Sequence, residues 1–277
     1  MIESGRFRMT FLADAYRDVD AAGDIAKLST CLDRMEDLPD FRAYKDASYA
    51  VLGLAPDGAV ADIACGLGHD LKRLRQRVPR GSVTGFDASA AFVAEAQRRI
   101  GEDPSVSVLV GDAGRLDAEA SSFDAARIDR SLQHIPDPAG VIAEMVRIVR
   151  TGGIVSAAEP DWRSFVIGSG LPGTADSVAG AFAEGFRNPL VGRALVGLIG
   201  QDLEITHHSV HPVLLRRLAD AEVIFDLTET VDRCVETGRF DADEGAAFVQ
   251  DLARRDAAGT FFALLNLHLV AGRKGGA

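Results

Sequence analysis

Hydrophobic positions change their spacing along the chain, and the change marks where one kind of element gives way to another. Over residues 10–54 they recur every three or four positions, as Leu12, Tyr16 and Val19 do, which is the period of amphipathic helices. A Pro-Asp-Gly tripeptide at 56–58 ends this pattern. The sequence therefore predicts a helical stretch of about 55 residues at the start of the chain.

After this stretch, short apolar runs alternate with helical patterns. The apolar runs predict buried strands at 59–65, 82–87, 106–112, 123–129 and 153–159. The helical patterns between them cover 69–78, 90–100 and 138–149. Such regular alternation is typical of right-handed βαβ units and a parallel sheet. Two further strands are expected at 203–210 and 261–272, with partly helical stretches around them.

The composition excludes several classes of protein. Hydrophobic residues make up 47% of the chain and charged residues 26%, as in ordinary globular proteins. The net charge of −11 argues against nucleic acid or an anionic membrane as a partner, because both need a positive field. Three cysteines without a CxxC pair argue against a disulfide framework and favour a cytoplasmic location. The N-terminus shows no export signal, and the apolar run at 261–272 is too short to span a bilayer.

A Gly-x-Gly turn within residues 60–70 joins a buried strand to a helix. Because Gly66 and Gly68 lack side chains, a ligand can lie against the main chain at the helix N-terminus. Taken alone, this is also the pattern of an ordinary strand-to-helix turn. However, Asp87 and Asp112 end the next two strands, and parallel strands bind ligands at their carboxyl ends. The three markers together predict a nucleotide site at this edge of the sheet.

Two classes of nucleotide compete for this site. A carboxylate in the place of Asp87 accepts hydrogen bonds from ribose hydroxyls in dinucleotide-binding enzymes. The dinucleotide fingerprint, however, has a third glycine where this chain has Leu71. A cofactor with an adenosine and an amino acid but no phosphates fits the turn better. A nicotinamide-dependent oxidoreductase is kept as the alternative.

In these motifs the chain resembles the class I methyltransferases that use S-adenosylmethionine, and more narrowly the small-molecule branch related to ubiquinone and menaquinone methyltransferases. The resemblance covers approximately residues 60–159 strongly and the last strand weakly. The first motif departs from the family's usual Asp/Glu-x-Gly-x-Gly-x-Gly at Ala64, a small residue with which binding is expected to survive. The remaining matching segments lie at 86–89, 111–113, 123–124, 131–138 and 150–153.

The resemblance implies an α/β, doubly wound, Rossmann-like sheet of seven strands with the last strand antiparallel. A single domain of 277 residues would then carry an N-terminal helical cap and helical lid insertions. The expected divisions are the cap at 1–55, the cofactor-binding core at 56–160, the substrate lid at 161–202 and 213–259, and the remaining core strands at 203–212 and 260–274.

The resemblance also implies a set of cofactor contacts. Asp87 would grip the ribose of S-adenosylmethionine and Asp112 the adenine amine, while the main chain of Arg130 and Ser131 would lie near the amino group. The complete expected set is Tyr16, Tyr44, Ala64, Gly66, Gly68, Asp87, Ala88, Asp112, Ala113, Arg130 and Ser131.

Methyl transfer is an in-line displacement that rests mainly on alignment, and a base helps when the acceptor is a hydroxyl or a protonated amine. His134 follows the fourth strand and titrates near neutrality, so it is the predicted base, with Glu159 or Asp161 assisting; a pocket-lining role is the alternative. Trp162 is expected to stack on a flat acceptor or to plug the base of the lid. No metal site is expected, because the sixth strand directs neighbouring histidines to opposite faces.

The sequence thus predicts an enzyme that methylates oxygen, nitrogen or carbon of a small molecule from specialised metabolism. A homodimer is one assembly compatible with it. The non-catalytic alternative is a module that binds S-adenosylmethionine without transferring its methyl group.

Overall fold

The computed structural model describes residues 15–16, 19–22 and 25–276. The start of the expected helical stretch at residue 10, with Leu12, lies outside these residues, as does the N-terminus that was searched for an export signal. All elements and contacts given below belong to the described residues.

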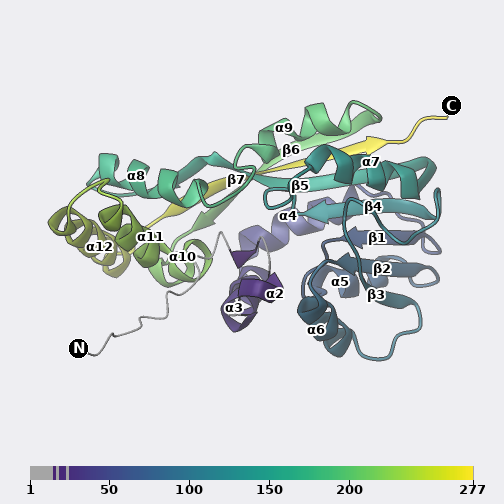
Figure 1. Cartoon of the computed structure of the whole chain (residues 1–277), viewed down its shortest axis with the longest axis horizontal. Coiled ribbons are helices and arrows are strands. Elements are labelled where there is room, and N and C mark those ends of the chain that lie inside the picture. The colour runs from purple at the N-terminus through teal and green to yellow at the C-terminus, as the bar shows by residue number, and fades with distance from the viewer. Residues whose placement is uncertain (1–14, 17–18, 23–24, 277) are drawn as a thin grey trace.

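The described part of the chain forms one seven-stranded sheet in the order β3-β2-β1-β4-β5-β7-β6 (Figure 1). Strands β1 to β5 run parallel, and β7 is antiparallel to both of its neighbours. The predicted seven-stranded α/β fold with an antiparallel last strand is therefore confirmed. The strands are β1 (Ala59–Ile63), β2 (Ser82–Asp87), β3 (Val106–Val110), β4 (Phe123–Asp129), β5 (Val149–Ile167), β6 (Glu204–Leu215) and β7 (Ala263–Arg273).

The sheet reverses its direction of growth between β1 and β4. The chain builds outward from β1 to β3, then returns to place β4 on the other side of β1. Ile63 at the end of β1 pairs with Phe86 on β2 and Ile128 on β4, so the carboxyl ends of the three strands lie together. In open α/β sheets, the crevice at such a reversal is where ligands bind.

Helices cover both faces of the sheet. One face packs against α7 (Pro138–Ile148) and α9 (Val191–Ile199). The other packs against α4 (Pro39–Ala50), α5 (His69–Arg77) and α6 (Ala90–Ile100). Because both faces are covered, the central strands are apolar on both sides, which explains why they read as continuous hydrophobic runs in the sequence.

Strands β5 and β6 are longer than the sequence predicted. Strand β4 ends opposite Ala158, so the rest of β5 pairs with β7 on one side and with no other strand of the described residues on the other. Pro160 is tolerated on such an edge, although a proline argues against a strand when only the sequence is read. The pairing with β7 shifts register between Asp161 and Val166, which is the signature of a local irregularity.

The long ends of β5, β6 and β7 carry a helical lobe, seen at the left of Figure 1. It consists of α8 (Pro172–Ala183), α10 (Leu218–Phe225), α11 (Leu227–Glu236) and α12 (Ala242–Ala257). A large apolar cluster joins this lobe to the strands beneath it. These helices fall within the stretches assigned to the substrate lid.

Two N-terminal helices lie between the lobe and helix α6. Helix α2 (Val19–Ala22) contacts α6, and α3 (Ile25–Asp37) contacts α10. Ion pairs strengthen the second contact: Arg34 of α3 donates to Asp220 at 2.5 and 2.9 Å. The N-terminal helices therefore bridge the two halves of the molecule over the strand ends.

Candidate active site

A cavity of about 580 Å³ opens at the carboxyl ends of β1, β2 and β4 and continues to the base of the helical lobe. Among the residues expected from the sequence, those that line it are Tyr16, Ala64, Gly66, Asp87, Ala88, Asp112, Ala113, Arg130, Ser131, His134 and Trp162. Four others do not line it, namely Tyr44, Gly68, Glu159 and Asp161.

The turn after β1 exposes main chain to the cavity at Gly66. This glycine has a φ of 52°, and a Cβ placed on it would have Leu32 at 3.8 Å as its nearest neighbour. Gly68 serves a different purpose, because a Cβ there would lie 3.1 Å from the Cβ of Ala96 on α6. The first glycine therefore leaves room for a ligand, whereas the second allows α5 to pack closely against α6.

Ala64 adopts the left-handed backbone that glycine favours, with a φ of 54°. An L-residue pays about 1–2 kcal/mol for this conformation. The amide of the next residue, Cys65, donates to the carbonyl of Phe86 at 2.9 Å, which holds the turn against β2. The departure from the family motif thus costs backbone energy but places no large side chain in the cavity.

Asp87 is placed to meet a ligand at the end of β2. Its two carboxylate oxygens accept from the amides of Gly66 at 2.8 Å and Ser89 at 2.9 Å, which fixes the side chain beside the bare turn. Burial raises the pKa of Asp87 above its ordinary value. A carboxylate has about four acceptor positions, so capacity remains for ribose hydroxyls. Asp112, exposed at the end of β3, accepts from the amide of Gly114 at 2.9 Å.

Asp20 of α2 is a cavity residue that the sequence analysis missed. Its carboxylate accepts from the hydroxyl of Ser89 and from the amide of Ala90 at 3.0 Å, at the first turn of α6. An acidic side chain is favoured there by the helix dipole. No local pattern in the sequence links Asp20 to a helix that begins about 70 residues later.

Beneath the cavity lies a buried network of charges centred on Arg127. Its guanidinium donates to Asp62 at 2.7 Å, to Asp70 at 2.9 Å and to Asp129 at 3.1 Å. The Arg127 side chain is only 1% exposed. Lys45 adds a second cation, 2.5 Å from Asp70 and 2.9 Å from Asp129. The sequence analysis missed this network because its members come from four separate elements.

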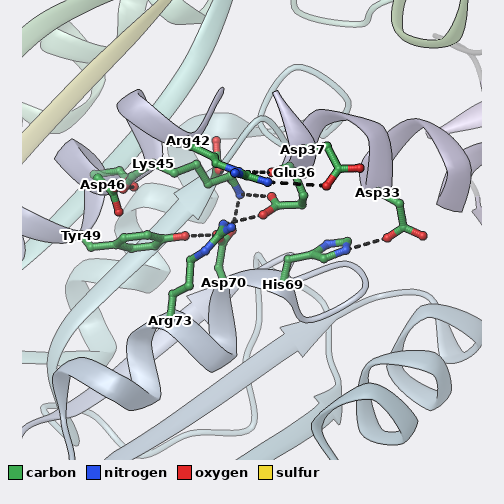
Figure 2. Close-up of polar contacts among 12 residues, drawn as sticks. Asp33, Glu36, Asp37, Arg42, Lys45, Asp46, Tyr49, His69, Asp70 and Arg73 are labelled. Carbon is green, nitrogen blue, oxygen red and sulfur yellow. Dashed lines mark hydrogen bonds and ion pairs between the residues drawn. The ribbon is translucent and has the colours of Figure 1, made fainter. Parts of the chain in front are cut away.

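Figure 2 shows how α4 contributes to this network. The Lys45 ammonium points between Asp70 and Glu36, which lie 2.5 and 3.5 Å away, and the Tyr49 hydroxyl points at Asp70. Tyr44, expected to contact the cofactor, is fully buried and donates to Asp129 at 3.1 Å instead. It therefore supports the floor of the cavity from behind.

Asp62 offers the cavity an acceptor that the protein itself does not use. It is 2% exposed and lines the cavity, and its Oδ2 has no hydrogen-bond partner among the described residues. Burial is the main reason that the pKa of Asp62 rises to about 7, despite the Arg127 charge that opposes it. A cationic ligand group such as an ammonium would satisfy this oxygen.

Arg130 and Ser131 begin the turn that follows β4. Arg130 has a left-handed φ of 53°, and its amide donates to the carbonyl of Ala158 at 2.8 Å. Its guanidinium lies 5.4 Å from the ring centre of Phe41, within reach of a cation–π contact. Strained backbone of this kind is held in place by its surroundings and occurs often at functional sites.

Glu159 and Asp161, expected to assist catalysis, are engaged away from the cavity. One carboxylate oxygen of Glu159 accepts from the amides of Ser131 at 2.8 Å and Leu132 at 2.7 Å. Asp161 pairs with Arg193 at 2.6 Å. Since neither carboxylate lines the cavity, direct proton transfer by either one has no support in the geometry. Glu159 instead fixes the turn that leads to His134.

His134 lies where the two ends of the cavity meet. Its amide donates to the carbonyl of Ser131 at 2.9 Å, which closes the turn. Its ring centre is 5.5 Å from that of Tyr16 and 5.4 Å from that of Phe186. Trp162, 7% exposed on β5, lines the cavity beyond Phe186. An imidazole in this position can exchange a proton with a ligand in the cavity.

Metal-binding clusters and membrane-spanning helices are both absent from the described residues. None of their histidine, cysteine, aspartate and glutamate side chains form a group of three or more that could hold a metal ion. Within the same part of the chain, every helix is too short or too polar to cross a membrane.

Known proteins share both the sequence motifs and the fold. Residues 60–153 match the family profile described as a methyltransferase domain. An uncharacterised 37.1 kDa protein of transposon Tn4556 from Streptomyces fradiae is 34% identical over 86% of this chain and 69% of its own length. The demethylmenaquinone methyltransferase of Beutenbergia cavernae is 32% identical over 55% of this chain and 58% of its own length. The chain thus spans less than two thirds of that enzyme.

Among solved structures, the phosphoethanolamine N-methyltransferase 2 of Haemonchus contortus has a similar fold, with a TM-score of 0.60. The match covers 95% of this chain and 60% of that one at 17% identity, and that structure contains S-adenosylhomocysteine. The chain therefore carries a methyltransferase domain over residues 60–153, as its motifs predicted. This match favours the methyltransferase over the nicotinamide-dependent alternative.

Proposed function

We propose that this protein transfers the methyl group of S-adenosylmethionine to a nucleophilic atom of a small molecule, with His134 as the base. The observation that carries the proposal is the single cavity that reaches from Gly66 and Asp87 to His134 and Trp162. A donor held at the strand ends and an acceptor held beside the aromatic side chains would share this space. Bringing the two reactants together in line is the main requirement of methyl transfer.

The residues at the strand ends of the cavity can each be matched to one part of the cofactor. Asp87 would hold the ribose, Asp112 the adenine amine, and the exposed main chain at Gly66 the amino-acid portion. The unsatisfied Oδ2 of Asp62 would accept from the ammonium group. These assignments use groups that have remaining hydrogen-bond capacity or open space.

When bound, S-adenosylmethionine supplies a methyl group whose carbon forms a bond to the acceptor while its bond to sulfur breaks and leaves the electron pair on sulfur. His134 removes the proton that a hydroxyl acceptor must lose, and later passes it to solvent. Glu159 acts as a positioning residue, because its carboxylate holds the Ser131 and Leu132 amides of the turn that leads to His134.

Replacement of His134 tests this mechanism. His134→Ala is expected to slow methyl transfer by about 10²-fold while S-adenosylhomocysteine still binds, because the imidazole contributes proton transfer and little binding. Turnover would be followed by mass spectrometry with a panel of hydroxyl-bearing acceptors and a methyl-labelled donor, and binding by titration calorimetry. His268→Ala, on β7 and outside the cavity lining, is the control.

The outcomes separate the alternatives of the sequence analysis. An unchanged rate of methyl transfer in His134→Ala would show that this histidine only lines the pocket. A wild-type protein that binds S-adenosylhomocysteine but methylates no member of the panel would favour the non-catalytic module. The specialised-metabolism acceptor, the cytoplasmic location and the homodimer stay predictions from the sequence.

A further inference from the structure

The two ends of the cavity differ in chemistry. Acidic and basic side chains gather at the strand ends and under α3, whereas β5, β7 and the helical lobe contribute apolar ones. The apolar end is formed chiefly by Trp162, Phe182, Phe186, Phe225, Leu265 and Leu267. His134 stands at the boundary between the two ends.

The aromatic rings of the apolar end form a rigid, flat-sided set. Trp162 stacks on Phe186 with ring centres 4.2 Å apart and planes 12° from parallel. Phe182 meets the Trp162 indole edge-on at 5.2 Å and 67°. The indole nitrogen of Trp162 donates to Gln133 at 2.7 Å, so its polar atom is already satisfied and its orientation fixed. Trp162 lies within the irregular part of β5, between Asp161 and Val166, and its amide donates to the carbonyl of Pro189 at 3.0 Å.

The apolar end offers no partner to a negatively charged acceptor. Among the described residues that line the cavity, the lysine and arginine side chains are Lys45 and Arg130, and both lie near Asp129, at 2.9 and 3.5 Å. Their charges are therefore compensated at the cofactor end. A carboxylate or phosphate placed among the aromatic rings would lose its water without gaining a partner, which is costly.

We propose that the methyl acceptor is a flat aromatic molecule without negative charge that bears a hydroxyl group. Its ring lies against Phe186, on the face of that ring that Trp162 does not cover, and its hydroxyl points to His134 at the boundary of the two ends. This inference rests on the proposed function, because it assigns the apolar end to the acceptor. Flat rings gain most from such neighbours, since offset-stacked and edge-on aromatic pairs add to the effect of buried area.

Three probe molecules of similar size distinguish the effect of the acceptor's shape on binding from the effect of its charge. They are 2-naphthol, which is flat and neutral; 2-naphthoate, which is flat and anionic; and 2-decalol, which is neutral but not flat. Binding of each is measured by calorimetry with the full chain saturated with S-adenosylhomocysteine. We expect 2-naphthol to bind about tenfold or more tightly than either of the other two.

A matched pair of variants locates the effect. Phe186→Leu keeps an apolar side chain but removes the flat face, so it should abolish most of the preference for 2-naphthol over 2-decalol. Phe262→Leu, a 38% exposed phenylalanine outside the cavity lining, should leave that preference unchanged. The melting temperatures of both variants establish that they are folded.

Equal affinity for 2-naphthoate, a preference that survives Phe186→Leu, or no binding of 2-naphthol at all would overturn this inference. In each case S-adenosylhomocysteine would still bind, and the proposed function would stand. Failure of S-adenosylhomocysteine to bind would instead defeat the proposed function itself.

Discussion

Glu159 provides a test of the site's electrostatics that does not depend on knowing the acceptor. Its carboxyl group is fully buried, and burial raises its pKa from 4.5 to about 8, although the Ser131 and Leu132 amides oppose this change. The folded protein therefore holds a proton on Glu159 at pH values where the unfolded chain has lost it. By linkage, stability must fall as pH rises through this interval.

The size of the effect follows from the two pKa values. Over about 3.5 pH units, at ~1.4 kcal/mol per pH unit, roughly 5 kcal/mol of stability is lost between pH 4.5 and pH 8. That is a large part of the ~5–15 kcal/mol by which proteins of ordinary stability resist unfolding. Below pH 4.5 and above pH 8, Glu159 does not make the free energy of unfolding depend on pH.

Glu159→Gln removes the titration and keeps a carbonyl oxygen that can accept from the same two amides. The variant and the wild type should have similar stability at pH 5, and the variant should gain on the wild type by about 1.4 kcal/mol per pH unit up to pH 8. Urea unfolding at four pH values measures this difference, in which the other titrating groups cancel. Glu204→Gln, at an exposed position on β6, should show no such trend. A difference that does not change with pH would show that Glu159 is ionised throughout, and would refute the reasoning.

Three further changes probe other parts of the site. Asp87→Ala should weaken S-adenosylhomocysteine binding by about 10- to 100-fold in calorimetry, because hydrogen bonds to a charged group contribute about 1.5–3 kcal/mol; unchanged affinity would remove Asp87 from the site. Arg127→Met should lower the free energy of unfolding by about 3–5 kcal/mol, since it leaves buried carboxylates uncompensated, and a smaller loss in urea titration would mean that water enters the network. Ala64→Gly should raise the thermal midpoint, because glycine relieves up to about 1 kcal/mol of left-handed strain; a lower midpoint would show that Ala64 is not strained.

The cofactor half of the molecule could be predicted because its signals are local. The predicted strand 82–87 and helix 90–100 agree with β2 and α6 residue for residue. Ser89 accepts from the amide of Phe92 at 3.1 Å and so begins the helix, and Gly101, with a φ of 73°, follows its end. Helix caps of this kind involve residues that are close together in the sequence, so they can be predicted without knowing the fold.

The floor of the cavity could not be predicted for the opposite reason. Arg127 lies within an apolar strand, and nothing near it in the sequence explains a buried charge. Its partners Asp62 and Asp70 lie 65 and 57 residues away along the chain. The sequence assigned Asp62 to a motif and Lys45 to a helix, but only the pairing of β1 with β4 and the packing of α4 bring their charges together.

The aromatic end of the cavity shows a different limit. Trp162, Phe186 and Phe225 come from separate segments. The sequence left Trp162 open between stacking on an acceptor and plugging the lid, and it did not single out the two phenylalanines. Whether an aromatic side chain fills a core or lines a pocket depends on whether a neighbour occupies the space beside it. The open space beside these rings is created by the packing of the long strand β5 against the helices of the lobe. A local sequence pattern therefore cannot predict it. Specificity in this fold can consequently change through a few substitutions in the lobe while the cofactor motifs stay the same, because the two ends of the cavity are built by different parts of the chain.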